Sequence, residues 1–185
     1  MEEEWLKKMI ALSSKFFISS SFLSSCFFFS SSFFLSLTLK SAQKAIGNVQ
    51  FELKEKRTAF ILSSTKGNIE GNISLADSAQ RIASQLGIDS KPIVVCNACI
   101  SGLSALILGN RLIDSGLYDA AIVCGCDTPR QFILSGFQSL KALSPEHCRP
   151  FDMERMGLNL GEAAATLRSE EHTSELQSPV PIPYA

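Results

Sequence analysis

The chain has 185 residues, of which 17 are basic and 18 acidic, and its formal net charge is −1. This length is sufficient for one domain with a hydrophobic core, and the balanced charge excludes a strongly basic nucleic-acid-binding protein. The six cysteines lie mostly in apolar runs. Because a chain of this size needs no disulfide framework, we expect reduced thiols in a cytoplasmic protein.

Residues 1–39 form a leader rich in phenylalanine and serine, without a charged residue between Lys15 and Lys40. The uncharged run is long enough to cross a bilayer, but its phenylalanine blocks have neither helical nor strand periodicity. The acidic start and the absence of a small-residue cleavage site are unlike a secretory signal. We therefore predict a low-complexity leader, either non-native or degenerate, with membrane insertion through residues 16–39 as the alternative.

The middle of the chain, residues 40–167, alternates short apolar runs with segments of helical periodicity. Apolar runs without polar alternation are typical of strands that helices cover on both faces, and the alternation of strands with helices indicates a layered α/β fold. We predict helices at 39–46, 75–86 (ended by Gly87) and 101–117, and strands at 58–64, 92–96 and 119–125. The apolar side of the third helix is expected to carry Leu103, Leu106, Ile107, Asn110 and Ile113.

Residues 168–185 read as a tail outside the fold. Pro179, Pro181 and Pro183 stand at every second position and forbid a helix or a central strand. The stretch Arg168–Ser178 also resembles the translation of a common sequencing adapter. We therefore expect the tail to be foreign to the domain, and we exclude His172 as a catalytic candidate.

Cys99 is the candidate nucleophile, because it lies between the end of a predicted buried strand and the start of a long predicted helix. Backbone N–H groups at a helix N-terminus are unpaired and the helix dipole is positive there, which favours a thiolate. The small neighbours Ala98, Ser101 and Gly102 leave room for a substrate at the sulfur. The structural alternative is a cysteine that serves as a small buried hydrophobic residue.

Two other uses of the cysteines remain open from the residues alone. Cys96 and Cys99 have the spacing of a redox pair, and together with Cys124 and Cys126 they could supply four thiolates to zinc. Metal-binding cysteines normally lie on short polar turns, whereas most of these lie in or at the end of apolar strands. We therefore predict no metal site.

A series of phrases after residue 92 resembles the β-ketoacyl-(acyl carrier protein) synthases, the condensing enzymes of fatty-acid and polyketide synthesis. The resemblance covers about residues 40–167 and is weaker before residue 92. Its phrases are Cys99 with its small neighbours, Gly125-Cys-Asp127, Phe137, Ala142-Leu-Ser144, Arg149-Pro-Phe-Asp152, Arg155-Met-Gly157 and Gly161-Glu-Ala-Ala164.

The resemblance implies the first half of a thiolase-like fold, with layers in the order α-β-α-β-α, in an enzyme that is usually a homodimer. It implies that Cys99 takes an acyl group from an acyl carrier protein thioester, and that its own backbone N–H forms half of an oxyanion hole. A malonyl thioester then loses carbon dioxide, and its carbanion attacks the acyl-enzyme. No cofactor is implied, since the substrates are carried on phosphopantetheine.

Other residues match weaker parts of the pattern. Phe137 lies where the family places residues near the acyl pocket. A loop that supports the site matches at Arg149, Phe151, Asp152, Arg155 and Gly157. The alternatives are that Phe137 is ordinary core and that the arginines and aspartate only fix a turn.

The sequence also departs from the family's pattern. Ala163 stands where the family most often has glycine, and Met156 where it has aspartate. Neither His147 nor His172 matches the family's two catalytic histidines, so we expect this chain to catalyse no condensation alone and to expose an apolar face. A non-catalytic partner subunit of the same fold is the alternative function.

Overall fold

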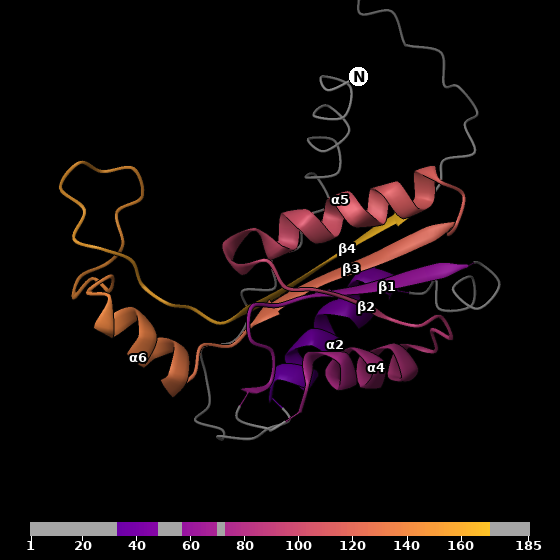
Figure 1. Cartoon of the computed structure of the whole chain (residues 1–185), viewed down its shortest axis with the longest axis horizontal. Helices are drawn as coiled ribbons and strands as arrows, with labels where there is room; N and C mark the ends of the chain where they lie inside the picture. Colours follow the sequence, from indigo (N-terminus) through magenta and orange to yellow (C-terminus); the bar gives the residue numbers. More distant parts are fainter. Residues whose placement is uncertain (1–32, 48–56, 70–72, 171–185) are drawn as a thin grey trace, which may run out of the picture.

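The computed structural model describes residues 33–47, 57–69 and 73–170, which form a four-stranded sheet between layers of helices (Figure 1). The strands are β1 (Thr58–Ser63), β2 (Ile93–Val95), β3 (Ala120–Asp127) and β4 (Ala163–Glu170), in the order β2-β1-β3-β4. β1 pairs in parallel with β2 and β3, whereas β4 pairs antiparallel with β3. The predicted α/β class is confirmed.

One face of the sheet packs against two helices, α2 (Phe33–Ile46) and α4 (Leu75–Leu86). In α2 every fourth residue is buried, namely Phe34, Thr38, Ala42 and Ile46. In α4 the Ser74 side chain caps the first turn by accepting a hydrogen bond from the Asp77 N–H. Gly87 ends this helix in the left-handed conformation, at φ 72°, as the sequence predicts. These helices and the sheet share one buried core.

The opposite face of the sheet packs against α5 (Ser101–Asp114), drawn above the strands in Figure 1. Its buried residues are Ser101, Ala105, Gly109 and Ile113, so only Ile113 of the predicted apolar side is buried. A Cβ at Gly109 would lie 3.1 Å from Val123 Cγ2. Small residues therefore face the sheet because the helix approaches it closely, while Leu103 remains 47% exposed.

Several element boundaries differ from the prediction, most of all near the two ends of the domain. α2 begins at Phe33 rather than Leu39, inside the predicted leader, and β4 continues to Glu170, so Arg168–Glu170 belong to the sheet although the sequence excluded them. Within the described residues, β4 pairs along its whole length with β3. The rest of the predicted leader, residues 1–32, and the rest of the predicted tail, residues 171–185, lie outside the described residues.

A third region, α6 (Gln131–Ser139) and residues 140–162, extends away from the sheet at the left of Figure 1. None of the residues of α6 is buried, although the helix contains four large hydrophobic side chains. Among the described helices, none combines the length and the apolar composition needed to cross a bilayer. The predicted span at 16–39 falls mainly outside the described residues.

Candidate active site

The carboxyl ends of β1, β2 and β3 meet at one edge of the sheet, because these strands are parallel. Three connections leave from this edge: residues 64–69 after β1, residues 96–100 after β2, and residues 128–130 after β3. Ligands of open α/β sheets bind at this edge, beyond the carboxyl ends of the strands. The candidate nucleophile lies on the second connection.

Cys99 lies in a single 3₁₀ turn, Ala98–Ile100, between β2 and the start of α5, and its side chain is exposed. Ile100 is the N-cap residue of α5 and makes no side-chain cap hydrogen bond. The thiol is therefore accessible and lies at the N-terminus of α5, as the sequence predicts. No side chain of the N-cap residue caps the backbone N–H groups of the first turn.

The turn that presents Cys99 is strained and held by Ser101. Ala98 has a positive φ of 45°, a conformation that costs an L-residue roughly 1–2 kcal/mol. The Ser101 hydroxyl accepts a hydrogen bond from the Asn97 N–H at 2.7 Å and donates one to the Ala98 carbonyl at 2.6 Å. Ser101 is 4% exposed, so the contacts that fix the turn are shielded from water. The sequence analysis noted Ser101 only for its small size.

The other described cysteines have different environments. Cys96 is exposed, and its thiol donates a hydrogen bond to the Thr65 carbonyl at 3.2 Å. Burial raises the pKa of Cys124 to about 11 and the pKa of Cys126 to about 12. Both thiols on β3 therefore stay protonated and unreactive near neutral pH.

The four cysteines considered for a zinc site lie in two different environments of the fold. Cys124 and Cys126 are buried under α2, where the Thr166 hydroxyl donates to the Cys124 sulfur at 3.0 Å. The exposed pair, Cys96 and Cys99, lies at the carboxyl edge of the sheet. Over residues 33–47, 57–69 and 73–170, no group of three or more His, Cys, Asp and Glu side chains could hold a metal ion.

The predicted supporting loop is folded by contacts within itself. The Arg149 guanidinium donates to the Glu154 carbonyl at 2.9 Å and lies 3.3 Å from a carboxylate oxygen of Asp152. Arg155 donates to the Asp152 carbonyl at 2.9 Å. Phe151, with a positive φ of 63°, is 99% exposed at the tip. These bonds describe a self-contained turn, and the role of the loop in supporting the site remains a prediction.

Gly157 is required where this loop returns to the end of α6. It has a φ of 146°, and a Cβ there would lie 2.6 Å from the Ala142 carbonyl oxygen. Leu158, the next residue, forms a parallel bridge with Leu143. Phe137 is half-buried on α6, and its role in an acyl pocket is likewise a prediction.

Residues 39–172 match the family model described as the N-terminal domain of β-ketoacyl synthases. This match covers more than half of the chain. The chain belongs to the β-ketoacyl synthase family.

Among curated relatives of this β-ketoacyl synthase domain, nodulation protein E of Rhizobium meliloti (strain 1021) is 32% identical over 126 residues, which cover 65% of this chain and 31% of the relative. The 3-oxoacyl-[acyl-carrier-protein] synthase 2 of the same strain is 35% identical over 85 residues, which are 42% of this chain and 20% of the relative. The chain therefore spans about a third or less of these proteins.

The fold is also similar to that of solved ketosynthases. A ketosynthase from Xenorhabdus doucetiae, in complex with its chain length factor, superposes with a TM-score of 0.61 at 29% identity. That match covers 74% of this chain and 43% of the solved chain. The thiolase-like layered architecture expected from the sequence is thus shown over part of the length of the solved ketosynthases.

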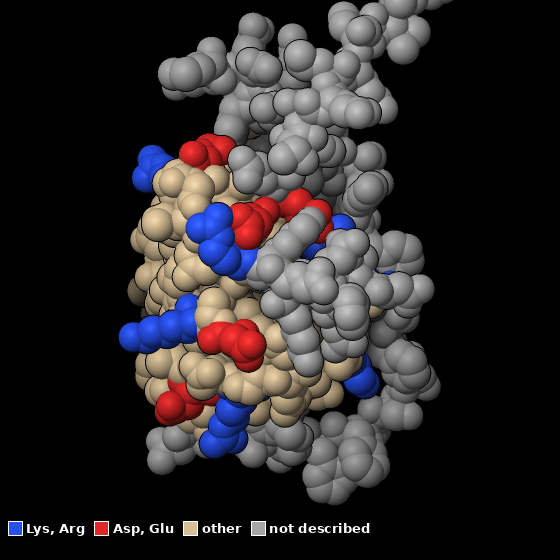
Figure 2. All heavy atoms as spheres, turned by 90° about the vertical axis from the view of Figure 1, so that its right-hand side faces the viewer, with Lys and Arg blue, Asp and Glu red and all other residues tan. Residues whose placement is uncertain are grey.

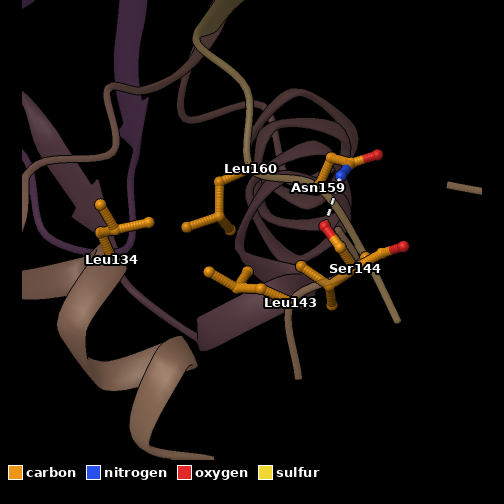
Figure 3. Close-up of a pocket in the computed structure, with 6 residues that line it drawn as sticks. Leu134, Leu143, Ser144, Asn159 and Leu160 are labelled. Carbon is orange, nitrogen blue, oxygen red and sulfur yellow. Dashed lines mark hydrogen bonds between the residues drawn. The ribbon is translucent and has the colours of Figure 1, made fainter. Parts of the chain in front are cut away.

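An open pocket with a volume of about 230 Å³ lies among the described residues of the β-ketoacyl synthase domain (Figure 3). Its lining comes from α6 and from the two strand-like segments of the loop: Leu134, Leu143, Ser144, Leu158, Asn159 and Leu160. Figure 3 shows the labelled leucines pointing toward one another, with the Asn159 amide directed to the opposite side, where it donates to the Ser144 carbonyl. Neither Cys99 nor Phe137 lines this pocket.

Charges of both signs are interspersed on the face seen in Figure 2. At the amino ends of the parallel strands, Arg57 and Asp119 form an exposed ion pair with a nitrogen-to-oxygen distance of 2.7 Å. Arg168 and Glu170 form a second pair on β4, also at 2.7 Å. The described surface of this face presents no single-sign patch.

Proposed function

We propose that Cys99 accepts an acyl group from a carrier thioester, as the first step of a carbon–carbon condensation. The observation that carries this proposal is an exposed thiol on a strained turn between β2 and α5, fixed by the buried Ser101 hydroxyl. A nucleophile held in one position at a helix N-terminus suits attack on a carbonyl carbon.

The acyl group moves from the sulfur of the carrier to the sulfur of Cys99, which is a thioester exchange. The Cys99 thiolate attacks the carbonyl carbon of the acyl thioester, and the resulting oxyanion receives hydrogen bonds from backbone N–H groups near the start of α5. The carbon–sulfur bond to the carrier then breaks, and the carrier thiolate leaves and takes up a proton. The acyl group ends on the sulfur of Cys99.

The complete protein would be a condensing acyltransferase of fatty-acid or polyketide-type synthesis. The name of the Rhizobium relative specifies an acyl carrier protein, and we propose such a carrier as the partner, with a homodimer as the assembled form. Phe137 would border the acyl chain, and Arg149, Phe151, Asp152, Arg155 and Gly157 would shape the site. We expect no decarboxylative condensation by this chain, since His147 lies on an exposed loop and does not match a catalytic histidine of the family.

The experiment is incubation of the chain with a short acyl-N-acetylcysteamine thioester, followed by peptide mass spectrometry. The acyl adduct is expected on the Cys99 peptide and absent in the Cys99→Ala variant. Cys148→Ala is the matched control, because it removes an exposed thiol and is expected to leave the Cys99 adduct unchanged. Cys96→Ala removes a second exposed thiol and is expected to slow acylation without abolishing the adduct on Cys99. An adduct on Cys96 or Cys148 instead of Cys99 would overturn the proposal. Absence of any adduct would favour a non-catalytic partner subunit.

A further inference from the structure

The Asp127 carboxylate, at the end of β3, concentrates three hydrogen bonds on one oxygen. Its Oδ1 accepts from the Ser64 hydroxyl at 2.8 Å, from the Thr65 N–H at 2.9 Å and from the Thr65 hydroxyl at 2.9 Å. Ser64 is 1% exposed, so part of this cluster is removed from water. Charge-assisted hydrogen bonds of this kind are about twice as strong as neutral ones.

The turn that Asp127 holds also contacts the strand that leads to the nucleophile. The Thr65 carbonyl accepts from the Cys96 thiol at 3.2 Å, and the Ser64 N–H donates to the Val95 carbonyl at 3.3 Å. Val95 ends β2, and Cys96 is three residues before Cys99. A continuous set of contacts therefore runs from Asp127 through residues 64–65 to the base of the nucleophile's turn.

The same turn is closed on its other side. The Ser64 hydroxyl accepts from the Gly67 N–H at 2.9 Å, and Gly67 has a positive φ of 62°. Hydrogen bonds to Asp127, to Cys96 and within the turn itself therefore hold residues 64–67 in place. Loss of the carboxylate would leave the Thr65 N–H and two hydroxyl groups without their acceptor.

We infer that Asp127 is a positioning residue for the acyl-transfer step, acting through Thr65 and Cys96 on the orientation of Cys99. This inference rests on the proposed function. It assigns a role in transfer to a residue that lies at the end of a different strand and contacts Cys99 only through other residues.

The test compares two reagents on Cys99 in the intact chain. Acyl transfer from the acyl-N-acetylcysteamine thioester requires the sulfur to be aligned with the oxyanion donors, whereas alkylation by iodoacetamide requires an accessible thiolate but no oxyanion donors. In Asp127→Ala the acylation rate of Cys99 is expected to fall on the order of tenfold. The iodoacetamide rate at Cys99 should stay close to that of the wild type.

Two variants separate positioning from general damage. Asp127→Asn keeps an oxygen acceptor in the same place and is expected to restore most of the acylation rate. Thr65→Val removes one of the three hydrogen bonds and keeps the backbone N–H, so an intermediate rate is expected. Cys124 and Cys126, buried in the core, report unfolding, because they become alkylated only if the core opens.

The outcomes are distinguishable. If the wild type itself gives no Cys99 adduct, the proposed function fails. If the wild type is acylated and Asp127→Ala matches its rate, only the role of Asp127 is overturned, and the same holds if Asp127→Asn is as slow as the alanine variant. If Cys124 and Cys126 become alkylated in Asp127→Ala, that variant has unfolded and the Thr65→Val variant is used in its place. A wild-type rate of Cys99 acylation in Thr65→Val then overturns the inference.

Discussion

Two regions of the described structure, the core under α2 and α4 and the region of α6 with residues 140–162, differ in how fully their apolar side chains are covered. Between the sheet and α2 with α4, Phe34, Phe60, Leu62 and Ile82 are each at most 1% exposed. On α6 and the loop that follows it, Phe132 is 63% exposed, and exposure is higher still at Leu140, Phe151 and Met153. Both regions are apolar in composition, but only the first forms a core in the described structure.

This difference shows that apolar composition alone does not determine burial. The α2–α4 core contains even a hydroxyl that makes its hydrogen bond inside the helix, from Thr38 to the Phe34 carbonyl at 2.7 Å. The outer side of α5 at Leu103 and the helix α6 at Phe132 instead expose hydrophobic side chains, which are normally buried when a partner surface is present. The chain spans only part of the solved ketosynthases, which is consistent with this uncovered surface.

The largest expected difference in stability is between alanine substitutions of two phenylalanines, one in each region. Phe60→Ala removes a fully buried ring from β1 and should lower the free energy of unfolding by about 3–5 kcal/mol. Phe151→Ala, at a site that is 99% exposed, should change it by less than about 0.5 kcal/mol. Urea unfolding followed by circular dichroism measures both. Similar losses in the two variants would contradict the division into a covered and an uncovered region.

Two helical glycines sharpen the comparison. Gly109→Ala on α5 places a Cβ 3.1 Å from Val123 Cγ2, so this buried side chain must shift by a few tenths of an ångström, and the change should cost about 1–3 kcal/mol. Gly136→Ala on α6 meets nothing within 4 Å and should gain helix stability of roughly 0.5–1 kcal/mol locally. Hydrogen exchange of the two helices distinguishes these results. Stabilisation by Gly109→Ala would show that α5 does not pack closely on the sheet.

An effect of a different kind is expected at alkaline pH. Burial raises the pKa of Cys124 to about 11 and of Cys126 to about 12, from an ordinary value of 9.0. Above pH 9 the unfolded chain therefore loses these protons while the folded chain keeps them. The free energy of unfolding should fall between pH 9 and about 12, on the order of 1 kcal/mol per thiol and pH unit.

Cys126→Ala should make this pH dependence shallower, and the exposed Cys148→Ala should leave it unchanged. The slope of the free energy of unfolding against pH is the quantity to compare, since the alanine in the core also lowers stability at every pH. An identical slope in all three proteins would mean that the buried thiols do not titrate as described.

Much of the fold was predictable because its signals are local. Helix α4 follows a capping serine, carries apolar residues at helical spacing and ends at Gly87, and the strands β1 and β3 are unbroken apolar runs. The start of α2 was missed because the phenylalanine blocks before it hide the fourfold spacing of Phe34, Thr38 and Ala42. That spacing crosses the boundary predicted at residue 39.

The remaining differences depend on tertiary contacts. Residues Arg168–Glu170 of β4 were excluded because they open a stretch that resembles an adapter translation and that prolines follow, yet in the described structure they pair with β3. The small buried stripe of α5 depends on how closely that helix approaches the sheet. At the site, the position of Cys99 followed from the sequence, but the bonds of Ser101 and Asp127 join residues whose proximity only the fold establishes.

The most direct test of the account is whether acylation of Cys99 depends on the folded turn. The chain is treated with the acyl thioester when folded and again in urea, and the acylation rates of Cys99 and Cys148 are compared by peptide mass spectrometry. Both thiols are exposed, so accessibility alone gives a ratio near one. We predict a ratio well above one in the folded chain that falls toward one in urea. A ratio that is the same in both states would contradict the claim that the β2–α5 turn makes Cys99 the acyl acceptor.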